Sequence, residues 1–102
     1  MRAWLRTTPE PAGDGVVVGL GGELDIAGLP AIEAELEALL ARAAQPVVLD
    51  LAELGFLDSS GVTVLIRIAN HFGQVRTRNA SSAVRRVVEV LGLGDRLGLD
   101  GA

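Results

Sequence analysis

The residues best suited to chemistry stand together in the string Asp58-Ser59-Ser60-Gly61. An aspartate or serine just before a helix accepts hydrogen bonds from the unpaired amides of the first turn. One such residue is enough for a cap, so an acid and two hydroxyls leave a group free for other work. The Ser60 hydroxyl would lie at the positive end of the helix dipole, where added negative charge is tolerated. Taken alone, the string fits a plain helix cap better than a modification site.

A serine hydrolase is one alternative, in which Ser59 or Ser60 would be the nucleophile and His71 and Asp58 would complete a catalytic triad. The sequence lacks the G-x-S-x-G elbow that exposes such a serine. His71 follows at the far end of the same predicted helix, about 16 Å from Ser60 at 1.5 Å per residue. Nucleophile and base must lie within hydrogen-bond reach of each other. The sequence therefore predicts that the chain is not an enzyme.

Two apolar elements position this string. The run Val47 to Leu51, preceded by Pro46, is nearly all apolar and predicts a central strand covered on both faces. A second apolar run predicts a helix from about Ser60 to Phe72, ended by Gly73. The four-residue string is then a corner between a strand and a helix.

The N-terminal part predicts a hairpin and a helix. Ala3 to Thr7 and Val16 to Leu20 read as paired strands. The glycines of 19–22 resemble a phosphate loop only weakly, and a strand exit with a bulge or turn is the better interpretation. A helix is expected from about Leu29 to Ala44, since apolar residues recur at helical spacing. The stripe consists of Leu29, Ile32, Leu36, Leu39, Leu40 and Ala43.

The C-terminal part predicts an edge strand over Gln74 to Arg78, then a cap and a third helix. The apolar stripe of that helix is Val84, Val87, Val88 and Leu91. A short element over Asp95 to Leu99 ends the pattern. The order β-β-α-β-α-β-α predicts an α/β fold: a single domain over residues 1–102, with a mixed β-sheet and three to four α-helices.

Composition excludes several classes of protein. The chain has 102 residues, no cysteine and one histidine, which excludes disulfide scaffolds and thiolate or histidine-cluster metal sites. No apolar run approaches the ~20 residues needed to span a bilayer. We therefore expect a soluble, cytoplasmic domain without membrane insertion, metal or cofactor.

Charge is unevenly spread along the chain. Residues 1–58 carry three arginines against ten acidic residues, a net of −7, whereas residues 59–102 carry six arginines against three acidic residues, a net of +3, which together give −4. Solvated helix faces explain this somewhat better than an acidic docking face does. Direct binding to nucleic acid is disfavoured because the chain is acidic, lacks lysine and has three aromatic residues.

Four strings in this order resemble one family, the STAS domains, and within it the bacterial anti-anti-sigma factors. They are Gly22-Glu23-Leu24-Asp25; Val48-Leu49-Asp50-Leu51 with Leu54-Gly55-Phe56; Asp58-Ser59-Ser60-Gly61-Val62; and Asn79-Ala80-Ser81 with Val84-Arg85-Arg86-Val87, closing on Gly92-Leu93. Each string is weak alone, and together they cover most of the chain, from about Val16 to Leu99.

The resemblance implies a STAS-type domain that acts as an anti-sigma factor antagonist. Such a protein binds an anti-sigma factor that is also a serine kinase, and so frees a sigma factor. The kinase phosphorylates the second serine of the corner, here Ser60, and a PP2C-type phosphatase removes the phosphate. Partner contacts are implied at Asp25, Asp58, Ser59, Ser60, Gly61 and Val62.

The resemblance also leaves an alternative. Some STAS domains do not switch and act as adaptors, for example as an accessory subunit of a lipid transporter or a signalling scaffold. In this sequence the helix after Gly61 is about one turn shorter than is usual in the family, and Ala80 takes a position often held by proline.

Overall fold

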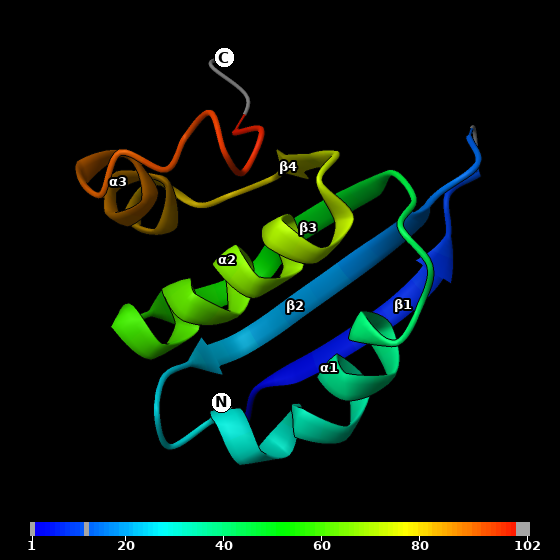
Figure 1. Cartoon of the computed structure of the whole chain (residues 1–102). Coiled ribbons are helices and arrows are strands. Elements are labelled where there is room, and N and C mark those ends of the chain that lie inside the picture. The colour runs from blue at the N-terminus through cyan, green and yellow to red at the C-terminus, as the bar shows by residue number, and fades with distance from the viewer. Residues whose placement is uncertain (1, 12, 100–102) are drawn as a thin grey trace.

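The apolar and β-branched runs of the sequence form a four-stranded sheet in the computed structural model, which describes residues 2–11 and 13–99 (Figure 1). The sheet order is β1-β2-β3-β4, and β1 pairs antiparallel with β2, whereas β2, β3 and β4 run parallel. This confirms the predicted hairpin, the mixed sheet and the α/β class. The strands are β1 Trp4–Pro9, β2 Val16–Leu24, β3 Val47–Leu57 and β4 Val75–Arg78.

The two central strands are longer than the sequence predicted. β2 continues through the glycines to Leu24, and β3 continues beyond Leu51 to Leu57. The predicted irregularity is present, because the register of β2 against β3 shifts twice within this stretch. The predicted exit from the sheet at 19–22 is wrong. The Trp4 ring lies over Gly19 and Gly21 of β2, so a large neighbour fills the space that their missing side chains leave.

The first helix is shorter than predicted and is divided. A 3-10 turn, η1 Leu29–Ala31, precedes α1 Glu33–Leu40, so the predicted end at Ala44 is wrong. At this end the Arg42 carbonyl accepts a hydrogen bond from Nε2 of His71 at 2.8 Å, which replaces a bond that a longer helix would supply. Ala43, the last residue of the predicted stripe, is exposed, so burial offers no gain for another turn.

The other two helices lie close to their predicted positions. α2 Ser59–Phe72 begins one residue early and ends at Gly73, whose φ of 76° suits a glycine at a helix end. α3 Ser82–Val90 is capped by the Ser81 hydroxyl, which accepts from the amide of Val84 at 3.2 Å. Its apolar stripe is narrower than predicted. Val84 and Val88 are buried, Val87 is half-buried, and Leu91 is 53% exposed.

The core lies between the helices and one face of the sheet. Figure 1 shows α1 and α2 on the same side of the strands, and the buried side chains of both helices join those of β2 and β3 in one cluster. Val17 and Val48 lie outside this cluster, on the opposite face. The strand from Val47 to Leu51 is central, as predicted, and its apolar side chains are buried on both faces, Val48 at 9% exposed, although the helices lie against one face only. On the face opposite the helices the Arg6 guanidinium stacks 4.9 Å from the centroid of the Trp4 ring.

Candidate functional site

The predicted corner lies where β2 and β3 end side by side. Leu24 is the register partner of Leu57, and the Asp58 amide donates to the Leu24 carbonyl oxygen at 3.3 Å. Asp25 and Asp58 therefore begin neighbouring loops at one edge of the sheet. The carboxyl ends of parallel strands are a common place for binding sites, because the loops that follow them converge there.

Asp58 is the N-cap of α2. Its Oδ1 atom accepts from the amides of Ser60 at 2.8 Å and Gly61 at 3.1 Å, and its backbone oxygen accepts from Val62 at 2.9 Å. A side chain that satisfies two amides at once is a strong helix start. The hydroxyls of Ser59 and Ser60 are therefore not needed as caps. Both belong to the first turn, which holds no acidic side chain.

Burial divides the six residues that the sequence singled out. Ser59 is exposed, and Asp25, Asp58 and Ser60 are half-buried. Two others lie behind this surface: Gly61 is buried, and Val62 belongs to the core at 5% exposed. The Val62 side chain therefore offers little surface to a partner.

Gly61 has a definite packing reason to be glycine. A Cβ at this position would collide with the Leu24 carbonyl oxygen and the Leu57 side chain. The backbone of α2 therefore approaches the end of β2 more closely than any residue with a side chain would allow. Gly61 sets the distance between the helix start and the loop that carries Asp25.

Asp25 shapes its own loop. Its Oδ1 atom accepts from the Gly28 amide at 2.7 Å, and its backbone oxygen accepts from the Gly28 and Leu29 amides at 3.0 Å each. These bonds turn the chain from β2 into η1. The family resemblance implied a partner contact at Asp25, and the structure shows that this half-buried side chain also forms the turn.

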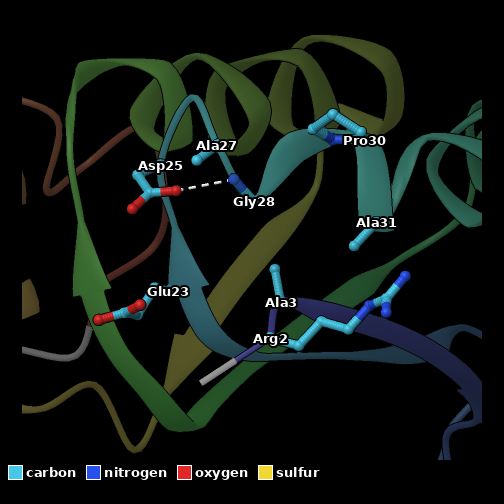
Figure 2. Close-up of a pocket in the computed structure, with 8 residues that line it drawn as sticks. All are labelled: Arg2, Ala3, Glu23, Asp25, Ala27, Gly28, Pro30 and Ala31. Atoms are coloured by element: carbon cyan, nitrogen blue, oxygen red, sulfur yellow. Dashed lines mark hydrogen bonds between the residues drawn. The ribbon is translucent and has the colours of Figure 1, made fainter.

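A pocket of about 430 Å³ lies beside this loop (Figure 2). Asp25 and Glu23 line one side, and Arg2 lies across from them. Sequence reasoning did not identify Arg2 or Glu23 as neighbours of the site. Only the antiparallel register of β1 against β2, in which Trp4 pairs with Gly21, brings the N-terminal residues to this end of the sheet.

His71 does not complete a hydrolase. It lies in the last turn of α2, Ser60 lies in the first, and the imidazole contacts the Arg42 carbonyl. The ring also packs edge-on against Phe72, with centroids 4.7 Å apart. The histidine therefore supports the α1 end and lies outside the corner.

A carboxylate on the sheet face opposite the helices, that of Asp50, has a lowered pKa. Partial burial tends to raise the pKa of Asp50, but hydrogen bonds from the Ala52 amide at 3.1 Å and from the Asn79 and Arg78 side chains at 3.3 and 3.2 Å stabilise the anion. The net result is a pKa of Asp50 below its ordinary value. These bonds tie β3 to the end of β4.

Within residues 2–11 and 13–99, no three or more acidic or histidine side chains come together in an arrangement that could hold a metal ion. Over the same residues, none of the helices has both the length and the apolar character needed to cross a membrane.

The chain resembles proteins of one family in sequence and structure. A family model described as "Mlab, STAS domain" matches residues 8–99. The solved structure of an anti-sigma factor antagonist from Mycobacterium paratuberculosis is 30% identical, with a TM-score of 0.73, and the match covers 96% of this chain and 86% of that one. The anti-sigma factor antagonist SpoIIAA in its unphosphorylated form is 28% identical, with a TM-score of 0.67, over 94% of this chain and 87% of that one.

A comparison with curated protein sequences finds no match. The family model nevertheless spans most of the chain, and the two solved structures share its fold over almost their whole length. The four strings that first indicated the family lie on or directly beside β2, β3, α2 and α3. The chain belongs to the STAS domain family.

Proposed function

We propose that this chain is an anti-sigma factor antagonist of the cytoplasm. It binds an anti-sigma factor that is also a serine kinase, and this binding frees a sigma factor. Phosphorylation of Ser60 turns the antagonist off, and a PP2C-type phosphatase restores it. Two solved relatives whose matches cover over nine-tenths of the chain are described as anti-sigma factor antagonists, and one of them is described in its unphosphorylated form.

The observation that carries the proposal is the arrangement of the α2 start. Asp58 supplies the cap, so the half-buried Ser60 hydroxyl is not required for it. A phosphate at this position meets the positive end of a 14-residue helix, which favours added negative charge. The fold can thus accept the modification at a corner that faces a partner.

The docking surface centres on the exposed part of the corner. Asp25, Asp58, Ser59 and Ser60 present carboxylates and hydroxyls to the partner, while Gly61 and Val62 support them from behind. Two carboxylates on adjacent loops favour a partner with basic side chains at the matching positions. Added phosphate charge then places like charges and extra bulk at this contact.

A second candidate is an adaptor without a switch, such as an accessory subunit of a lipid transporter. The family model favours this candidate, because its description names Mlab and does not name an anti-sigma factor antagonist. In that case the same corner docks a partner, and Ser60 acts only as a surface contact.

A kinase assay separates the two candidates. The chain is incubated with ATP and each anti-sigma factor kinase encoded in its genome, and intact mass and fragmentation locate any phosphate. The antagonist takes up one phosphate on Ser60, and Ser60→Ala takes up none while Ser59→Ala remains a substrate. A chain that binds such a kinase but is never phosphorylated, or is phosphorylated on Ser59 or Ser82, rules out the proposed switch.

A further inference from the structure

A small apolar groove lies on the α3 side of the corner. Its volume is about 130 Å³, and nearly all of its surface is apolar. The end of β3 forms one wall and the first turns of α3 form the other. The lining residues are Gly55, Phe56, Leu57, Ala83, Val84 and Val87.

Phe56 is the exposed part of this groove. It is 49% exposed, although Leu57 beside it is buried at 5%. Successive side chains of a strand point to opposite faces, so Leu57 joins the core and Phe56 does not, and β4, which pairs with β3 only as far as Asp50, does not lie beside Phe56. The end of β3 therefore extends past its neighbour, and α3 covers it incompletely. An exposed phenylalanine next to an apolar groove forms part of a contiguous apolar patch, and such patches mark interaction surfaces more often than single scattered apolar residues do.

The groove is continuous with the corner. Phe56 lies on β3 two residues before Asp58, the Leu57 between them lines the groove, and the exposed Ile26, at 74%, follows Asp25 on the neighbouring loop. Stable interfaces bury about 800 Å² on each partner around a few apolar anchors with a polar rim. Carboxylates and hydroxyls alone do not supply such anchors. Phe56 and Ile26 are the large apolar side chains that flank them.

We infer that the Phe56 groove receives one large apolar side chain of the same protein partner that docks on Ser59 and Ser60. This inference rests on the proposed function and adds a specific contact to it. A cavity of about 150 Å³ accommodates benzene, so a groove of about 130 Å³ suits a single leucine, isoleucine, methionine or phenylalanine side chain. Phe56 is then the anchor, and the corner is the polar rim that carries the switch.

The test measures binding by calorimetry to an anti-sigma factor that binds the wild-type chain. Phe56→Ala removes the anchor, and Ala83→Trp, at an exposed position in the groove wall, fills the groove while Phe56 itself is retained. Leu91→Ala is the matched control, because it removes an apolar side chain of similar exposure, 53%, directly after the C-terminal end of α3. Both groove variants are expected to bind at least tenfold more weakly, and the control less than twofold. Melting temperatures establish that all three variants are folded.

Each result has one meaning. If wild type binds an anti-sigma factor and both folded groove variants bind it equally well, the groove inference is overturned and the proposed function stands. If wild type binds no anti-sigma factor of its genome, the proposed function fails and this inference fails with it. If sedimentation of the chain alone shows a dimer that Phe56→Ala dissociates, the occupant is a second copy of the chain, which also overturns the inference.

Discussion

The amide of Asp58 and the carbonyl oxygen of Leu24, 3.3 Å apart, join the exits of two parallel strands. Because Asp25 follows Leu24 directly, the same bond fixes the Asp25 loop relative to the start of α2. The corner is thus an extension of the sheet, and its geometry depends on backbone contacts as much as on its side chains.

The close approach of α2 to β2 predicts that Gly61 tolerates no side chain. Gly61→Ala forces the helix start away from the Leu24 carbonyl, and overpacking of this kind costs about 1 to 3 kcal/mol. Gly94→Ala is the control, since a Cβ there meets nothing within 4 Å. Urea unfolding should show a lower midpoint for the first variant and nearly wild-type behaviour for the second. Equal midpoints would refute the contact.

The two amide bonds of Asp58 predict a measurable contribution to stability. Asp58→Ala leaves the Ser60 and Gly61 amides without their cap and should cost about 1 kcal/mol. Asp58→Asn keeps an oxygen acceptor and should restore most of this loss. The free energy of unfolding from denaturant titration provides the measurement. A variant Asp58→Ala as stable as wild type contradicts the capping role.

The packing of α3 predicts opposite outcomes for two valines of one helix. Val88→Asp places an unpaired charge at a position that is 1% exposed, and should cost several kcal/mol, much of the stability of a small domain. Val90→Asp is at a position 77% exposed and should cost little. Thermal unfolding followed by circular dichroism distinguishes them. Similar melting temperatures would mean that α3 does not pack through Val88.

The lowered pKa of Asp50 predicts a small acid sensitivity. A carboxyl whose pKa is lower in the folded state stabilises the fold above its unfolded-state pKa, near 3.8, and this contribution is lost as the pH falls through the folded-state pKa. The pair with Arg78 is partly exposed, so the effect should stay below about 1 kcal/mol. Asp50→Asn should therefore lose less stability between neutral pH and pH 2 than wild type does. A parallel loss in both chains contradicts the assignment.

Phosphate at Ser60 is predicted to weaken partner binding while leaving the fold intact. It adds about −1.5 to −2 charges beside Asp58. A loss of ~3 to 4 kcal/mol corresponds to a factor of several hundred in affinity. Ser60→Ala should stay bound to the kinase in the presence of ATP, whereas phosphorylated chain and, less completely, Ser60→Asp should dissociate. If calorimetry gives equal affinities for modified and unmodified chain, the domain is an adaptor.

Local patterns predicted most of the fold. The strand-to-helix change at Asp58 and the cap at Ser81 were evident because capping residues and apolar periodicity agree there. The end of α1 was not predictable in this way. The bond that occupies the Arg42 carbonyl comes from His71, 29 residues further along the chain, and no local pattern contains it.

The glycines of β2 illustrate the same limit. Gly19 and Gly21 are typical of a turn when read alone, and they belong to a strand only because Trp4 lies over them from β1. At the corner, the sequence identified the cap but did not predict that Val62 lies in the core. Arg2 lies across a pocket from Asp25 and Glu23, and this placement could not be predicted without knowing the register of β1 against β2.

The position of Trp4 has a practical consequence for optical experiments. It is the single tryptophan of the chain, and its ring rests on the sheet face opposite the helices. Its fluorescence emission therefore reports the integrity of the β1–β2 hairpin, because separation of the strands exposes the indole to water. A partner that docks at Ser60, at the start of α2, leaves the environment of the Trp4 indole unchanged. One intrinsic fluorophore can thus follow unfolding without a label in every variant above except Ala83→Trp, which adds a second tryptophan and needs circular dichroism instead.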